Sequence, residues 1–98
     1  MKVITLCGSM KYQKEMIEIS QKLELEKGYC VIQCIYDLNQ VSEKQKQLLG
    51  DLHFKKIDIS DAIYVVNIGG YIGESCKAEI QYAKSKNKEI IYHEKIEK

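Results

Sequence analysis

The residue types best suited to chemistry lie in the stretch NIGGYIGESCKAEIQYA, residues 67 to 83. A run of apolar strand formers ends at Asn67, and Gly69, Gly70 and Gly73 follow within six positions. Glycines permit positive φ and let a ligand approach the backbone closely. The N–H groups of a following helix favour an anion or an oxygen-rich group. The stretch predicts a ligand-binding turn, and the alternative is a plain connection between strand and helix. It has neither the GxxxxGK[ST] spacing of a P-loop nor the GxGxxG spacing of a dinucleotide-binding turn.

Glu79 is the candidate for catalysis in this stretch. If Ser75 is the N-cap of the following helix, the partner in a capping box would be residue 78, which is Ala78. Glu79 stands one position too late for that role, so we expect it in the first turns of the helix, near the glycine turn. Partial burial there would raise its pKa, while the helix N-terminus would favour its charged form. The alternative is a solvated surface glutamate.

Seven segments of alternating type must position these residues. Apolar runs predict strands at 2–7, 29–35, 62–68 and 89–93. Helical spacing predicts helices at 11–27, from an N-cap at Ser42 to about Ser60, and at 75–86. Gly28 and Asn87 stand where helices end. The last residues read as a charged tail.

This alternation predicts a single α/β domain over residues 1–98: a small Rossmann-like or flavodoxin-like three-layer sandwich with right-handed crossovers. We expect a four-stranded parallel sheet in the order 2-1-3-4, with its apolar strands covered on both faces. Ligands of such sheets bind beyond the carboxyl ends of the strands, where the strand order reverses. The loops CGSMKY and NIGGYIGES should therefore meet at one crevice, between the first and third strands.

Composition argues against some classes of partner and indicates the cellular compartment. A formal net charge of +1 gives no electrostatic case for nucleic acid or an anionic membrane. No apolar run reaches the length of a membrane span, and the N-terminus turns polar too soon for a signal peptide. We therefore expect a cytoplasmic protein with reduced cysteines.

The cysteines and histidines do not show a metal-binding pattern. No cysteine pair has the CxxC spacing, and His53 and His93 are far apart in sequence, so we expect no metal site and no cofactor. Cys30 and Cys34 share one face of the predicted second strand, where we expect them to be small core residues.

The segments CGSM, GGYIGES and AEIQYAKSKNKEIIY together carry a family resemblance. Over roughly residues 2 to 93, the chain resembles the nucleoside 2-deoxyribosyltransferase superfamily, and most closely its small, largely uncharacterised bacterial and phage members. The phosphoribohydrolases that release bases from nucleoside monophosphates are similar, with a GG loop before a helix glutamate. The strongest match is the segment that begins at Ala78, in which a helix glutamate is followed by YA, a polar stretch and a final strand.

The resemblance implies that Glu79 is the nucleophile that attacks C1′ of a deoxyribonucleoside. The transferases carry an aspartate a few residues earlier for the sugar hydroxyl, and Glu74 is its stand-in here. They carry another aspartate in the preceding helix, where this chain has His53 and Asp58. Further substrate-binding candidates come from the two loops: Gly8, Ser9, Met10, Tyr12, Gly69, Gly70, Tyr71 and Ser75.

Two functions follow as expectations. The first is a transferase or hydrolase: an N-glycosidase or deoxyribosyltransferase that cleaves the N-glycosidic bond of a nucleoside or nucleotide. The second is a non-catalytic nucleotide-binding module that uses the same crevice. A domain of this size has a marginal core, so we also expect a homodimer or larger assembly, with Leu48, Leu49 and Leu52 either at the contact or covering the sheet.

Overall fold

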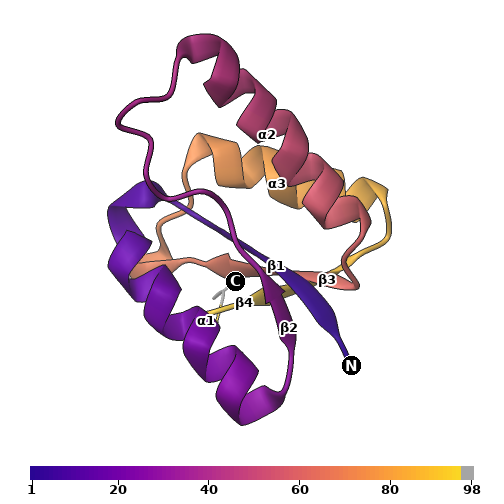
Figure 1. Ribbon diagram of the computed structural model, residues 1–98. Helices are drawn as coiled ribbons and strands as arrows, with labels where there is room; N and C mark the ends of the chain where they lie inside the picture. Colours follow the sequence, from indigo (N-terminus) through magenta and orange to yellow (C-terminus); the bar gives the residue numbers. More distant parts are fainter. Residues whose placement is uncertain (96–98) are drawn as a thin grey trace.

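Four parallel strands form one sheet in the order β2-β1-β3-β4 (Figure 1), as predicted. The computed structural model describes residues 1–95, and residues 96–98, part of the predicted tail, lie outside the described chain. The strands are β1 (Val3–Gly8), β2 (Cys30–Ile32), β3 (Ala62–Val66) and β4 (Glu89–Tyr92). The strand order reverses between β1 and β3, which places both of the glycine-containing turns at one edge.

Helices cover both faces of the sheet (Figure 1), so the predicted three-layer α/β class is confirmed. The helix α1 (Gln13–Lys27) packs on one face, and α2 (Glu43–Asp58) and α3 (Glu74–Ser85) pack on the other. Alternation along β1 divides the core: Ile4 and Leu6 face α1, while Cys7 faces α2 and α3. Each face of the sheet therefore has its own apolar cluster.

Local capping chemistry sets several of the helix ends, and the observed bounds differ from the predicted ones by up to two residues. Ser42 caps α2 in a capping box with Gln45, and Gly28 ends α1 in the left-handed conformation at φ 69°. The third helix was predicted over 75–86 but spans Glu74–Ser85 with Gly73 as its N-cap, so the condition that Ser75 is the N-cap does not hold. Glu74 places an acidic side chain in the first turn, where the helix dipole favours it.

The second strand is shorter than predicted, spanning Cys30–Ile32 rather than 29–35. It is an edge strand that pairs with β1 alone, and the chain leaves the sheet after Ile32. The prediction that Cys30 is a core residue is wrong, because its side chain is exposed at the edge of the sheet. Cys34 is half-buried. The segment after β2 is thereby free to form one wall of a pocket.

Polar and aromatic contacts fix α2 on the sheet and against α3. The buried hydroxyls of Thr5 and Ser60 form a 2.6 Å hydrogen bond in which either can be the donor, and both oxygens lie within hydrogen-bond distance of the Lys56 carbonyl, at 3.1 Å and 2.8 Å. The ring of Phe54 packs on that of Tyr82, with centroids 4.7 Å apart. These contacts set the rotation of α2, and so the direction in which its inner side chains point.

The C-terminal end of the described chain is held by a buried asparagine. The side chain of Asn67 accepts from the backbone N–H of Glu94 at 2.7 Å and donates to its carbonyl at 2.9 Å. The backbone N–H of His93 continues the parallel pairing by donating to Val65 at 2.8 Å. The β3–α3 turn is therefore supported from behind by the segment that follows β4. No helix in residues 1–95 combines the length and apolarity that crossing a membrane requires.

Candidate functional site

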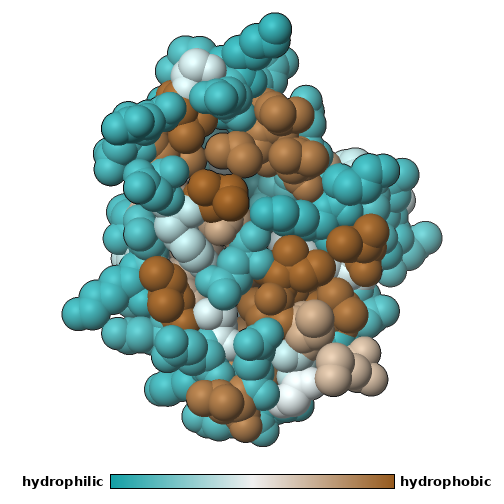
Figure 2. Space-filling model, viewed as in Figure 1, coloured by the Kyte–Doolittle hydropathy of each residue, from teal (hydrophilic) through white to brown (hydrophobic). Residues whose placement is uncertain are grey.

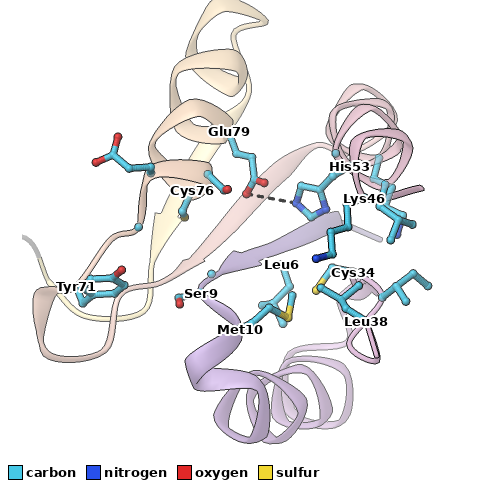
Figure 3. Close-up of a pocket in the computed structure, with 18 residues that line it drawn as sticks. Leu6, Ser9, Met10, Cys34, Leu38, Lys46, His53, Tyr71, Cys76 and Glu79 are labelled. Atoms are coloured by element: carbon cyan, nitrogen blue, oxygen red, sulfur yellow. Dashed lines mark ion pairs between the residues drawn. The ribbon is translucent and has the colours of Figure 1, made fainter. Parts of the chain in front are cut away.

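A pocket of about 470 Å³ lies at the carboxyl edge of the sheet, between α2 and the loops that follow β1, β2 and β3 (Figure 3). Its walls come from four parts of the chain, which are remote in sequence. They are Leu6, Gly8, Ser9 and Met10 at the end of β1 and just after it; Cys34, Ile35 and Leu38 after β2; Lys46, Leu49, Gly50, His53 and Lys56 of α2; and Tyr71, Gly73, Glu74, Ser75, Cys76 and Glu79 before and within α3.

Two thirds of the predicted site residues line this pocket. They are Gly8, Ser9, Met10, His53, Tyr71, Glu74, Ser75 and Glu79. The prediction that the two glycine-containing loops meet is confirmed, because residues of both loops line this pocket. The Lys11 ammonium also lies 3.7 Å above the ring of Tyr71, so the loops touch directly at the rim.

Tyr12 and Asp58 stand elsewhere. The ring of Tyr12 packs edge-on against Tyr71 at a centroid distance of 6.2 Å, behind the pocket wall. Asp58 lies at the far end of α2 and accepts a 2.6 Å hydrogen bond from the hydroxyl of Tyr82. In this arrangement Asp58 links α2 to α3, and Tyr12 supports Tyr71.

The glycines act mainly through the backbone and packing. Gly69 and Gly70 adopt φ 64° and 80° in the turn after β3 and do not line the pocket. The turn itself accounts for these two glycines, because positive φ is costly for other residues. At Gly8, a Cβ atom would lie 3.1 Å from Sδ of Met16 and 3.2 Å from Cβ of Val66, so the absence of a side chain allows α1 to pack closely.

Glu79 is not the solvated surface glutamate of the alternative reading. Its side chain is only 17 % exposed and reaches the pocket from the second turn of α3. Figure 3 shows its carboxyl group directed toward the imidazole of His53 on α2, with 3.5 Å between Oε1 and Nε2. Nε2 also lies 3.5 Å from the Sγ atom of Cys7, at the end of β1 beneath the pocket. Three chemically distinct side chains thus converge at one point.

Burial sets the protonation of this group. It raises the pKa of Glu79 to about 7, with the Cys7 thiol acting weakly in the opposite direction. It lowers the pKa of His53 to about 4, assisted by the positive charge of Lys56. It also raises the pKa of the Cys7 thiol well above its usual value, with the Glu79 charge adding to the effect. At neutral pH the contact between His53 and Glu79 therefore joins a neutral imidazole to a carboxyl that is partly protonated, rather than two opposite charges.

Glu74 differs from Glu79 in its surroundings. Its side chain is 92 % exposed and pairs with Lys77 at 3.2 Å on the outer side of α3. Surface pairs of this kind contribute little to stability and leave the carboxylate free to turn. Glu74 is accordingly a rim residue, and Glu79 is the carboxyl group of the pocket interior.

Several residues of the pocket were not predicted as site residues. Lys46 and Leu49 of α2 and the segment at Cys34–Leu38 supply a wall that the sequence gives no motif for. Lys56 of α2 also lines the pocket and donates to the carbonyl of Gln33 at 2.8 Å. The helical spacing from Lys46 to Leu49, Gly50 and His53 is the one signal that places them on a common face of α2.

Cys7 was also missed as a member of the site. It is 46 residues from His53 along the chain, and only the strand order of the folded sheet brings its side chain under the pocket. The expectation of no metal site rested on spacing along the sequence, which does not detect side chains brought together from three separate elements.

Comparisons of this chain with protein-family models, with curated proteins and with solved structures gave no significant match.

Proposed function

We propose that this protein cleaves the N-glycosidic bond of a nucleoside or nucleotide, with Glu79 as the nucleophile. The observation that supports the proposal is the placement of Glu79. It is a largely buried carboxyl group in a pocket at the strand-order reversal of a parallel sheet, where ligands of such folds bind.

The chemistry suits a carboxylate in this place. Cleavage of an N-glycosidic bond passes through an oxocarbenium-like state, which a carboxylate beside C1′ stabilises or captures. The Glu79 oxygen forms a bond to C1′ as the bond from C1′ to the base nitrogen breaks, and the base takes up a proton. Attack on the ester by water completes hydrolysis, and attack by a second base completes transfer.

The remaining pocket residues have supporting roles in this proposal. The carboxylate of Glu74, a residue of the pocket rim, would bind a sugar hydroxyl. Gly8 and Ser9 offer backbone and hydroxyl groups beside the sugar, and Tyr71 offers a ring face to a base. The ammonium groups of Lys46 and Lys56 give the α2 wall a positive charge that would suit a phosphate.

The test is the release of free base from a panel of deoxynucleosides and nucleoside monophosphates, measured by chromatography. We expect release or base exchange with at least one compound, and a loss of several orders of magnitude in rate in Glu79→Gln. Glu74→Gln, a change of the same kind on an exposed carboxylate, is the matched control and should lose less. Absence of release from every compound, or unchanged release in Glu79→Gln, would contradict the proposal.

A second candidate is a nucleotide-binding module without catalysis, and one observation favours it. Burial holds Glu79 partly protonated at neutral pH, and a protonated carboxyl donates a hydrogen bond but does not attack carbon. A ligand of this module would raise the melting temperature of the protein increasingly as its concentration exceeds its Kd, and it would be recovered intact. The same panel therefore separates the two functions.

A further inference from the structure

Cys7, His53 and Glu79 form a three-residue cluster at the floor of the pocket. Their Sγ, Nε2 and carboxylate oxygen atoms all lie within 4.8 Å of one another. Cys7 comes from β1, His53 from α2 and Glu79 from α3, so three separate elements aim a polar atom at one point. Cys7 is 1 % exposed and His53 is 7 % exposed, so the donor atoms gather where water is scarce.

The separation between His53 and Glu79 suits two ligands of one ion better than partners of a direct hydrogen bond. Nε2 of His53 lies 3.5 Å from both the Glu79 oxygen and the Cys7 sulfur. A direct bond between a ring nitrogen and a carboxyl oxygen is normally 2.7–3.2 Å. Tetrahedral zinc has bonds of about 2.0–2.3 Å to nitrogen, oxygen and sulfur, so its neighbouring ligand atoms lie about 3.3–3.6 Å apart. Both separations from Nε2 fall in this second range, and the one to Sγ is also an ordinary length for a thiol hydrogen bond.

We propose that Cys7, His53 and Glu79 bind a thiophilic divalent cation of the zinc class. The donor set is a thiolate, a neutral imidazole and a carboxylate, which together favour zinc over magnesium or calcium. The Cys7 proton leaves on binding, as does any proton on Glu79, so two negative charges face the cation. The fourth coordination position opens toward the pocket, since His53 and Glu79 line it.

This site shares Glu79 with the proposed glycosidic chemistry but does not depend on it. A carboxylate oxygen bound to a cation is a poor nucleophile, so the ion and the sugar compete for one side chain. A cation would therefore inhibit base release, if that activity is present. Binding of the cation can be measured without any nucleoside, which keeps the two proposals separable.

The probe is Co²⁺, whose visible bands report tetrahedral geometry and whose near-ultraviolet charge-transfer band reports a thiolate ligand. Titration of the full chain under reducing conditions should give both bands, with an end point at one ion per chain. Zn²⁺ added afterwards should displace the cobalt and bleach the bands, as the divalent affinity order predicts.

Variants locate the ligands. Glu79→Gln and His53→Gln should weaken Co²⁺ binding at least tenfold, and Cys7→Ser should remove the charge-transfer band. Cys30→Ser is the matched control: it removes an exposed thiol that lies outside both the cluster and the pocket, and it should keep both bands. Because this variant leaves Cys7 intact, the result stands even if Cys7→Ser fails to fold. Absence of the bands from the wild-type chain, or their loss in Cys30→Ser, would overturn the site.

Discussion

Nε2 of His53 and Oε1 of Glu79 lie 3.5 Å apart, and burial shifts the pKa values of these two groups in opposite directions. Between about pH 4.5 and 7 the folded protein retains a proton on Glu79 that the unfolded chain has lost, so the free energy of unfolding falls as the pH rises. Between about pH 4 and 6.5 the unfolded chain holds a proton on His53 that the folded protein does not hold. The free energy of unfolding therefore rises with pH over this range. The two effects oppose each other over most of this range.

Single substitutions should expose each effect. In Glu79→Gln the His53 effect remains, and the free energy of unfolding should rise from pH 4 to 6.5 by on the order of 2 kcal/mol. In His53→Gln the Glu79 effect remains, and the free energy should fall from pH 4.5 to 7 by a similar amount. Urea unfolding of metal-free protein at several pH values measures both. Profiles of the same slope in the two variants would show that the groups are not buried as described.

The pairing of Asn67 with the backbone of Glu94 makes a separate prediction about stability. Asn67→Ala removes both hydrogen bonds to the backbone of Glu94. Because Asn67 is 2 % exposed, the N–H and carbonyl groups of Glu94 lose a buried partner. We expect a loss of about 1–3 kcal/mol in the free energy of unfolding. Asn39→Ala, at an exposed position, is the control and should change stability by less than about 0.5 kcal/mol. Equal stabilities of the two variants in urea unfolding would rule out the described role of Asn67.

The homodimer or larger assembly stays a prediction, and the structure shows which leucines of α2 are exposed for such a contact. On α2, Leu48 and Leu52 are 55 % and 44 % exposed, so they do not cover the sheet, whereas Leu49 faces the pocket. Figure 2 shows apolar side chains in separate groups among hydrophilic ones on the viewed face. If α2 forms the contact, Leu52→Lys should shift the protein toward monomer, while Leu25→Lys on α1, where Leu25 is 87 % exposed, should not. Light scattering at several concentrations measures this, and a monomeric wild type at high concentration would refute it.

The fold was predictable because each local signal agreed with the next. The apolar runs of β1 and β3, the Ser42 capping box and the Gly28 helix end all point to the same alternation of strand and helix. The alternation in turn fixes the strand order and the edge of the sheet at which a ligand would bind. The length of β2 was not predictable, because the apolar pattern continues past the point where its single neighbour, β1, stops pairing with it.

Part of the candidate site was predictable. Residues close in sequence to a strand end could be placed, and residues farther along the chain could not. Residues beside a strand end, such as Gly8, Ser9 and Tyr71, could be placed from topology alone. The α2 wall depends on the rotation of that helix, which the Thr5–Ser60 and Phe54–Tyr82 contacts fix in three dimensions. The roles predicted for Asp58, Gly69 and Gly70 came from position along the chain, and these residues lie away from the pocket.

The most direct test of the central claim is a search for the sugar on Glu79 itself. The protein is mixed with the compound whose base it releases, quenched during turnover and digested with trypsin before mass spectrometry. Cleavage after Lys77 separates Glu74 from Glu79, which falls in the peptide AEIQYAK at residues 78–84. The account predicts that this peptide gains the mass of one sugar or sugar phosphate group, and that Glu79→Gln shows no such gain. Steady release of base with this peptide unmodified throughout, or with the sugar on the peptide that carries Glu74, would contradict it.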